Sequence, residues 1–260
     1  MLRAAGRGHA ARASAALTRP GVLAALVSVV AAVGLQLWVA PESPPGFIRD
    51  EASFALNAHT LSRDLRDQDG ARLPLFFPSF GDYKPPVFPY ALAGVFRVTG
   101  PDERVARGLA TAAVLGAVLL VGLLAWRRTG SAAVVAVVVL LAGTVPWLFE
   151  LGRVALDTAL TPLAVVSILV VVEWASRSPA PSWARGTAVG VALGLFAYTY
   201  ASARLLAPLY AAALLVFVRP GRWAWLAWSW GVFALAVHPH VGGGAAVCRA
   251  RRLRGDRGGG

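Results

Sequence analysis

The sequence predicts an all-α membrane protein, a polytopic helical bundle with juxtamembrane helices in a large first outer loop. Hydrophobic residues make up 57% of the chain and charged residues only 15%, so the apolar surface exceeds what one soluble core of 260 residues can bury. Runs of near-spanning length fit a bilayer core about 30 Å thick. Seven candidate spans are expected, at residues 20–40, 106–126, 131–149, 155–175, 186–201, 205–218 and 223–238.

The first apolar run follows a basic segment, residues 1–19. This order is also typical of a secretory signal peptide, for which Val39-Ala40 would supply small residues near a cleavage point. The run is longer than a usual signal core, however, and its removal would take away the first anchor of the outer loop. A membrane span is therefore the preferred interpretation.

Charge distribution predicts the orientation. Arginines cluster before the first span and in alternate loops, without acids, whereas eleven of the 13 acidic residues fall on the opposite side. Because cytoplasmic loops are enriched in Lys and Arg, the N-terminus should be cytoplasmic and residues 41–105 should form an extracytoplasmic loop. The net charge of +12 then encodes topology and not nucleic-acid binding. The transmembrane domain is expected to cover residues 20–238.

Two helical segments are expected within the outer loop. Pro86–Val98 would reach only about 20 Å as a helix, and treating it as a span would move Arg127 and Arg128 to the outer face. It is therefore predicted to be a juxtamembrane or re-entrant helix. Glu51–Arg66 is predicted to be an amphipathic helix lying flat on the membrane. Its apolar face would consist of Phe54, Ala58, Leu61 and Leu65.

The C-terminal tail, residues 239–260, is rich in Gly and Arg. Its arginines would be extracytoplasmic, against the rule that the other loops obey. Either a late span is miscounted, or the tail is disordered or not the native continuation of the chain.

Ionisable residues gather at the outer ends of the predicted spans. Lys84 is the chain's only lysine, and the loop that holds it also carries two adjacent acids. Because ionisable groups at membrane depth are costly unless paired or facing water, their convergence predicts a polar cavity. The alternative is that Arg153 pairs with Asp157 one helical turn away and Arg204 reaches the lipid head groups.

An ordered set of short motifs carries a resemblance to a known family. They are Asp50-Glu51-Ala52 with Asn57-Ala58, Leu73-Pro74-Leu75, Ser79-Phe80-Gly81-Asp82-Tyr83-Lys84-Pro85-Pro86, Pro146-Trp147, Gly152-Arg153-Val154-Ala155, Tyr198-Thr199-Tyr200 and Ser202-Ala203-Arg204-Leu205. In this order and spacing the chain resembles multi-span glycosyltransferases of the GT-C type, specifically the bacterial family 39 enzymes related to protein O-mannosyltransferases and aminoarabinose transferases. It departs from them at Leu148, where relatives often have His. Relatives are also usually longer, so the chain is expected to be a C-terminally truncated member.

The resemblance implies inverting transfer of a sugar from a polyprenyl-phosphate donor to a protein, lipid or glycan acceptor at the outer face. It places Asp50 as general base, with Glu51 assisting. It also implies that three cations bind the donor phosphate and that three further residues contact substrate. The cations are Lys84, Arg153 and Arg204, and the substrate contacts are Asp82, Tyr83 and Asp157. The sequence requires no cofactor, and it leaves a divalent metal open.

Two other interpretations remain. The chain could be a polytopic transporter or lipid-binding membrane module, or an inactive N-terminal fragment of a transferase. Transport would be favoured by inverted repeats and broken helices at the membrane midplane. The sequence shows no repeat, and its polar residues gather at one face, so chemistry at the membrane surface is favoured.

Overall fold

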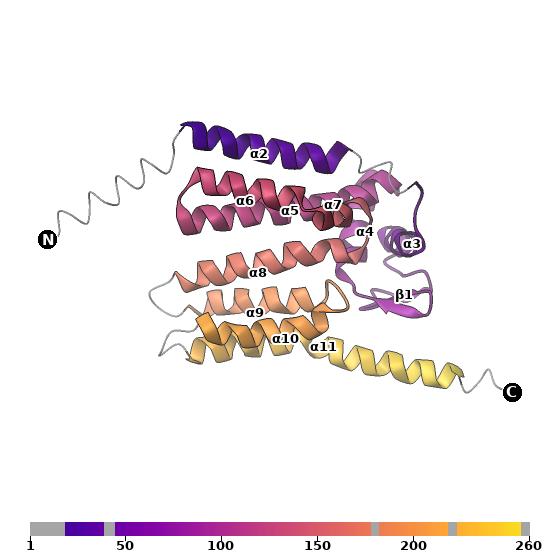
Figure 1. The fold of residues 1–260 in the computed structure, drawn as a ribbon. Helices are drawn as coiled ribbons and strands as arrows, with labels where there is room; N and C mark the ends of the chain where they lie inside the picture. Colours follow the sequence, from indigo (N-terminus) through magenta and orange to yellow (C-terminus); the bar gives the residue numbers. More distant parts are fainter. Residues whose placement is uncertain (1–18, 39–44, 178–181, 218–222, 256–260) are drawn as a thin grey trace. The chain divides into compact units, whose positions relative to one another are not determined.

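The computed structural model describes residues 19–38, 45–177, 182–217 and 223–255 (Figure 1). These residues form α-helices with one short hairpin, which confirms the predicted helical membrane class. The chain divides into two compact units. The first consists of Met1–Ala52 and Val98–Val170, and the second of Ser53–Arg97 and Val171–Gly260. The predicted basic tail and the last residues of the C-terminal tail lie outside the described residues.

The first unit is built on helices that pack side by side (Figure 1). They are α2 (Arg19–Trp38), α5 (Glu103–Thr129), α6 (Ala132–Thr144), α7 (Pro146–Arg153), the 3-10 helix η1 (Asp157–Ala159) and the first part of α8 (Leu160–Ser176). Gly143 of α6 packs directly on Ala32 of α2, where any side chain would collide. Such small residues let membrane helices approach closely without a hydrophobic driving force.

Local sequence signals explain where these helices begin and end. Asp102 caps α5 by accepting hydrogen bonds from the N–H groups of Arg104 and Val105. Gly130 ends α5 in the left-handed conformation, with φ 64°, and its N–H donates to the carbonyl of Trp126. Pro146 starts α7 and ends α6, so the two helices meet at a bend of 58°.

The second unit contains the remainder of α3 and a hairpin followed by helices. Its elements are α3 (Arg49–Asp64, of which the first four residues belong to the first unit), β1 (Phe77–Ser79), β2 (Asp82–Lys84), α4 (Val87–Thr99), the end of α8, α9 (Trp183–Ala197), α10 (Ala203–Ala213), η2 (Leu214–Phe217) and α11 (Trp223–Gly255). The strands pair antiparallel through the two-residue turn Phe80-Gly81, in which both φ angles are positive. That is the turn geometry that matches the twist of a two-residue hairpin.

A stripe of glycines brings α9 against α11 in the second unit. Gly186, Gly190 and Gly194 recur every four residues on one face of α9. A Cβ on Gly190 would lie 2.6 Å from the carbonyl oxygen of Ser229, and one on Gly194 would lie 2.5 Å from the Cβ of Ala236. The spacing is the small-xxx-small pattern of membrane helix pairs.

The apolar residues of α3 are buried within the protein, so protein and not lipid covers this face, and the flat placement of α3 on the membrane stays a prediction. Phe54, Ala58 and Leu61 are each at most 2% exposed. The ring of Phe54 packs edge-on against Phe88 of α4, with 5.3 Å between centroids. Leu65 lies beyond the end of the helix with φ 56° and is 39% exposed, so it is not part of that face.

Within the described residues, three helices are long and apolar enough to cross a membrane. They are Arg19–Trp38, Glu103–Thr129 and Asp157–Ser176, and the bent pair α6 and α7 makes a fourth if it is one span. Helices α4, α9 and α10 are apolar but shorter. The count of seven spans stays a prediction, as does the re-entrant placement of α4.

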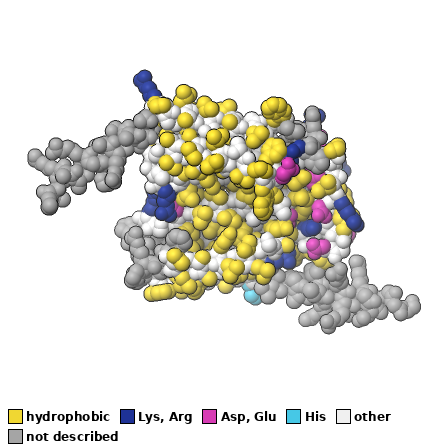
Figure 2. Space-filling model, in the orientation of Figure 1, with side chains coloured by type: hydrophobic (Ala, Val, Ile, Leu, Met, Phe, Trp, Pro, Cys, Tyr) yellow, Lys and Arg dark blue, Asp and Glu magenta, His cyan; other side chains and the backbone are white. Residues whose placement is uncertain are grey.

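Exposed aliphatic side chains support contact with lipid. Leu23, Val27 and Val30 of α2 are 59–70% exposed, and Figure 2 shows hydrophobic side chains over much of the face in view. Water would disfavour so large an apolar surface, whereas the bilayer core accepts it.

Candidate functional site

The predicted site residues divide between the two units. Asp50, Glu51, Arg153 and Asp157 belong to the first unit. The second unit holds Asp82, Tyr83, Lys84 and Arg204. The residues of each unit are therefore described separately.

Glu51 is the most completely bonded of these residues. Its side chain is 0% exposed. Its Oε1 accepts a hydrogen bond from the N–H of Ala155 (2.7 Å) and one from Nε of Arg107 (3.1 Å). Its Oε2 accepts from the N–H of Ile48 (3.0 Å) and from Nη2 of Arg107 (3.2 Å). Because donors surround both oxygens, this carboxylate is held in one orientation.

Arg107 is the counterion of Glu51, and it was not predicted from the sequence. Its side chain is 1% exposed; Nη1 contacts Glu103 Oε1 at 2.7 Å, and Nη2 also donates to the carbonyl of Gly46 at 2.7 Å. It stands one residue inside the apolar run that begins at residue 106. A charge within an apolar run was the signal that could have revealed it, because such charges are rare at membrane depth and are usually paired.

Asp50 is the immediate neighbour of this anchored pair. It lies in the first turn of α3 and is partly exposed, unlike Glu51. The backbone of this turn is fixed on one side by the bond between Glu51 and the N–H of Ile48, and on the other by the α-helical bond from the N–H of Ala52 to the carbonyl of Ile48. Asp50 therefore combines a fixed backbone with a carboxylate that solvent or a substrate can reach.

Arg153 ends α7 and does not pair with Asp157 through a helical turn. Its Nη1 lies 3.5 Å from Glu150 Oε1, and its Cζ lies 4.9 Å from the centre of the Phe149 ring. Its Nε is buried and has no hydrogen-bond partner among the described residues. Val154 leaves the helix with φ −119° and ψ 136°, so the one-turn spacing to Asp157 no longer applies.

The turn after Arg153 is tied to both α3 and α5. The N–H of Ala155 donates to Glu51, and the hydroxyl of Thr111 donates to the carbonyl of Gly152 at 2.7 Å. Asp157 follows in η1 and is 5% exposed. The structure thus brings Glu51 to the backbone that carries Arg153, and the adjacent Asp50 shares this anchor.

The Pro85-Pro86 pair would be expected to place Lys84 at the start of a helix, but the structure places it at the end of a strand. It is the last residue of β2, opposite Phe77 of β1, and Pro85-Pro86 separates it from α4. Its Nζ is 3.7 Å from Asp82 Oδ2, and its side chain is 22% exposed. The hairpin forms because of the Phe80-Gly81 turn, and it carries Asp82, Tyr83 and Lys84 on one strand.

Arg204 lies in the first turn of α10, against the same hairpin. Its Cζ is 5.2 Å from the centre of the Phe76 ring. Phe76 immediately precedes Phe77, the strand partner of Lys84. Within the second unit the structure therefore brings Arg204 to the part of the hairpin that carries Lys84. The Nε and Nη2 atoms of Arg204 are buried without a hydrogen-bond partner among the described residues.

One arginine in each unit has a buried N–H group that could donate a hydrogen bond to an anion. The described residues contain no group of three His, Cys, Asp or Glu side chains arranged to hold a metal ion. In contrast, Arg153 and Arg204 each present a buried N–H that no described residue accepts. Buried donors are nearly always satisfied in native proteins, and phosphate oxygens make strong charge-assisted hydrogen bonds with guanidinium groups.

Comparison with known families gives one finding. The model of the family described as dolichyl-phosphate-mannose-protein mannosyltransferase matches residues 83–241, more than half of the chain. The matched region includes Lys84, Arg153 and Arg204, whereas Asp50 and Glu51 precede it. Neither the curated proteins nor the solved structures gave a match.

Proposed function

Because the chain belongs to the dolichyl-phosphate-mannose-protein mannosyltransferase family, we propose that it transfers a sugar from a polyprenyl-phosphate donor to an acceptor hydroxyl at the extracytoplasmic membrane face, with inversion at the anomeric carbon. Membership confirms the resemblance to GT-C glycosyltransferases that the motifs carry. The chain is accordingly a membrane-embedded glycosyltransferase that uses a lipid-linked donor. The proposal requires that the acceptor carry a hydroxyl group, and it does not specify whether the acceptor is a protein, a lipid or a glycan.

The proposed reaction is a single displacement. The acceptor oxygen attacks the anomeric carbon as the bond from that carbon to the phosphate oxygen breaks. Asp50 takes the proton of the acceptor hydroxyl, and the polyprenyl phosphate leaves with the electron pair of the broken bond. A carboxylate placed to accept a proton in the transition state typically contributes about 10²–10⁴-fold in rate.

The fixed position of the neighbouring residue, Glu51, is the observation that supports the role of Asp50 as general base. Glu51 is bound by Arg107 and by the N–H of Ala155, so the first turn of α3 is fixed relative to the turn that presents Arg153. In this proposal Glu51 is a positioning residue, because its oxygens are already occupied by donors. Asp50 is left partly exposed to meet the acceptor.

The three cations are proposed to hold the donor phosphate. Arg204 supports this role because its guanidinium is braced on Phe76 and has two N–H groups that no described residue accepts. Arg153 offers one more such group. Lys84 adds a point charge, and a cation in contact with the leaving phosphate would stabilise the negative charge that develops on it.

The remaining predicted residues are proposed to contact the substrate. Tyr83 is 39% exposed on β2, beside Lys84. Asp82 holds the Lys84 ammonium at 3.7 Å and so limits its range of positions. Asp157 is 5% exposed in η1, close in sequence to Arg153.

Removing a phosphate-binding cation should weaken donor binding. Lys84→Ala and Arg204→Met are each expected to raise the Kd for the polyprenyl-phosphate sugar about ten- to a hundredfold, because a hydrogen bond to a charged group contributes about 1.5–3 kcal/mol. Lys84→Arg should be only partly active, since a planar fork does not replace a compact ammonium. The measurement is a titration of the labelled donor into the purified chain in lipid nanodiscs.

The matched control is Arg63→Met, which removes an exposed arginine from α3 in the same unit. Its Kd should equal that of the unsubstituted chain. If Lys84→Ala and Arg204→Met also bind the donor with unchanged affinity, the phosphate role is excluded for both. Full activity of Lys84→Arg would show that Lys84 is only a head-group anchor.

The proposed orientation predicts which loops face the outside. After Cys248→Ser removes the chain's one cysteine, Asp69→Cys in the outer loop should react with a membrane-impermeant maleimide in intact cells. Thr129→Cys, at the last residue of α5, should react only after the membrane is permeabilised. Both positions are exposed in the structure, so a difference in labelling reflects the side of the membrane on which each residue lies and not its burial in the protein. If instead Thr129→Cys reacts in intact cells and Asp69→Cys does not, the topology is the reverse of the one proposed, and the site does not lie at the extracytoplasmic face.

A further inference from the structure

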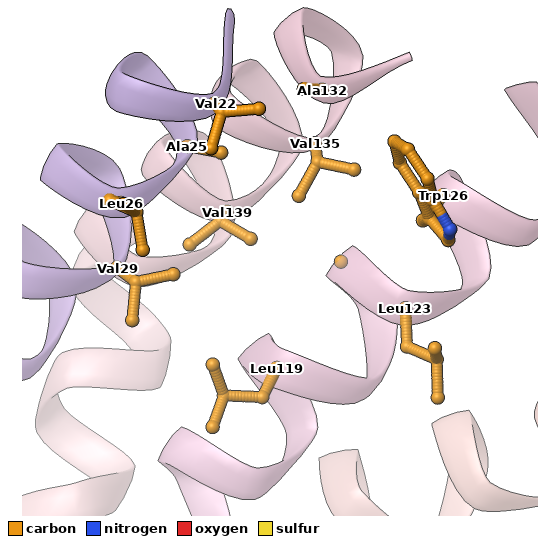
Figure 3. A pocket seen from close by; sticks show the side chains of 11 residues that line it. Val22, Ala25, Leu26, Val29, Leu119, Leu123, Trp126, Ala132, Val135 and Val139 are labelled. Carbon is orange, nitrogen blue, oxygen red and sulfur yellow. The ribbon is translucent and has the colours of Figure 1, made fainter. Parts of the chain in front are cut away.

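The first unit contains an apolar groove that the proposed chemistry does not use. It has a volume of about 310 Å³ and lies among α2, α5 and α6 (Figure 3). Apart from Gly122 and the indole of Trp126, aliphatic side chains line it. Along α5 the groove begins at Leu119, about 18 Å of helix away from Arg107. It is therefore separate from the anchor of the predicted catalytic turn.

Arginines stand at the end of the unit where the groove lies. The groove residues come from the early turns of α2, the late turns of α5 and the early turns of α6. Arg19 starts α2, and Arg127 and Arg128 follow Trp126 directly. Arg19 and Arg128 are exposed. The sequences of these three helices contain no acid other than Glu103, which lies at the opposite end of α5.

We propose that this groove binds one acyl chain of an anionic phospholipid, whose phosphate is held by Arg19 and Arg128. The aliphatic wall suits a hydrocarbon chain, and the adjoining cations suit a negatively charged head group, which is the combination that gives stable association with anionic lipid. Trp126 lines the groove two residues before Arg128, as expected for an aromatic ring at the level of the head groups. In the orientation proposed above, this lipid belongs to the cytoplasmic leaflet and not to the leaflet of the sugar donor.

Lipid-dependent stability of the full chain tests this site. The Tm is measured in a neutral detergent during titration with phosphatidylglycerol or with phosphatidylcholine, and native mass spectrometry counts the lipids that remain bound. Phosphatidylglycerol should raise the Tm at lower concentration than phosphatidylcholine. Arg128→Gln and Arg19→Gln should each raise the half-saturating concentration of phosphatidylglycerol about fivefold, the loss expected for one surface cation.

Two pairs of variants separate the groove from the general surface. Ala25 lines the groove, whereas Ala24 is exposed outside it, so Ala25→Phe should abolish retention of the lipid and Ala24→Phe should not. Arg104→Gln removes an exposed arginine at the opposite end of α5 and should leave phosphatidylglycerol binding unchanged.

Three results would overturn the proposal. They are equal stabilisation by the two lipids, equal weakening by Arg104→Gln and Arg128→Gln, and lipid retention by a folded Ala25→Phe chain. If Ala25→Phe does not fold, the comparison of Arg104→Gln with Arg128→Gln still tests the proposal, because both arginines are exposed and their substitution does not disturb the packed core.

Discussion

Asp50→Asn is expected to slow sugar transfer by about 10²–10⁴-fold while leaving the affinity for the polyprenyl-phosphate donor nearly unchanged. The amide keeps the size of the carboxylate and the first turn of α3, but it cannot accept the proton of the acceptor hydroxyl. Binding is measured by titration with labelled donor and turnover by release of polyprenyl phosphate, both with the purified chain in nanodiscs.

Asp64→Asn is the matched control for this result. It makes the same chemical change on the same helix, at an exposed position in the last turn of α3. Its turnover should equal that of the unsubstituted chain. Near-normal turnover of Asp50→Asn would exclude Asp50 as general base. An equal loss of turnover in both variants would show that the substitutions act by disturbing α3 and not by removing a general base.

Arg107→Met should produce the largest loss of stability, about 3–5 kcal/mol in the free energy of unfolding. The substitution leaves the buried Glu51 carboxylate without its counterion, and breaking one side of a buried ion pair costs this much. Arg104→Met, one turn earlier on α5 and exposed, should have little effect. Reversible unfolding in detergent, followed by circular dichroism, gives the comparison.

The double variant Glu51→Gln with Arg107→Met separates positioning from stability. Much of the lost stability should return, because no charge remains buried without a partner. Transfer should nevertheless stay slow at unchanged donor affinity, since the turn that carries Asp50 has lost its attachment to Arg107. A double variant that regains both stability and normal turnover would show that the pair only supports the fold. A stable Arg107→Met single variant would contradict the buried ion pair itself.

Apolar runs predicted the long helices well, because their boundaries depend on local chemistry. Residues 106–126 correspond to α5, whose ends are fixed by the Asp102 cap and by Gly130. The hairpin at residues 77–84 was not predicted, because each strand has three residues and Phe80 adopts a positive φ that its residue type does not signal. The burial of α3 by protein could not be predicted, because an amphipathic pattern does not show whether protein or lipid covers the apolar face.

The contacts of the predicted site residues could not be predicted from the sequence. Glu51 and Arg107 are far apart in sequence, and no periodic pattern links an outer loop to a distant helix. The alternative in which Arg153 pairs with Asp157 assumed a continuous helix, but Val154 is extended, and Arg153 contacts Glu150. Arg204 was a candidate because of its motif, whereas its stacking on Phe76 depends on the hairpin and appears only in the structure.

The anomeric configuration of the product tests the central proposal most directly. The purified chain in nanodiscs receives a polyprenyl-phosphate sugar labelled with ¹³C at the anomeric carbon, together with a hydroxyl-bearing acceptor, and NMR compares the configuration of donor and product. Single displacement assisted by Asp50 predicts a product of opposite configuration and one released polyprenyl phosphate for each sugar transferred. Retention of configuration, or label that stays on the polyprenyl phosphate, would contradict it.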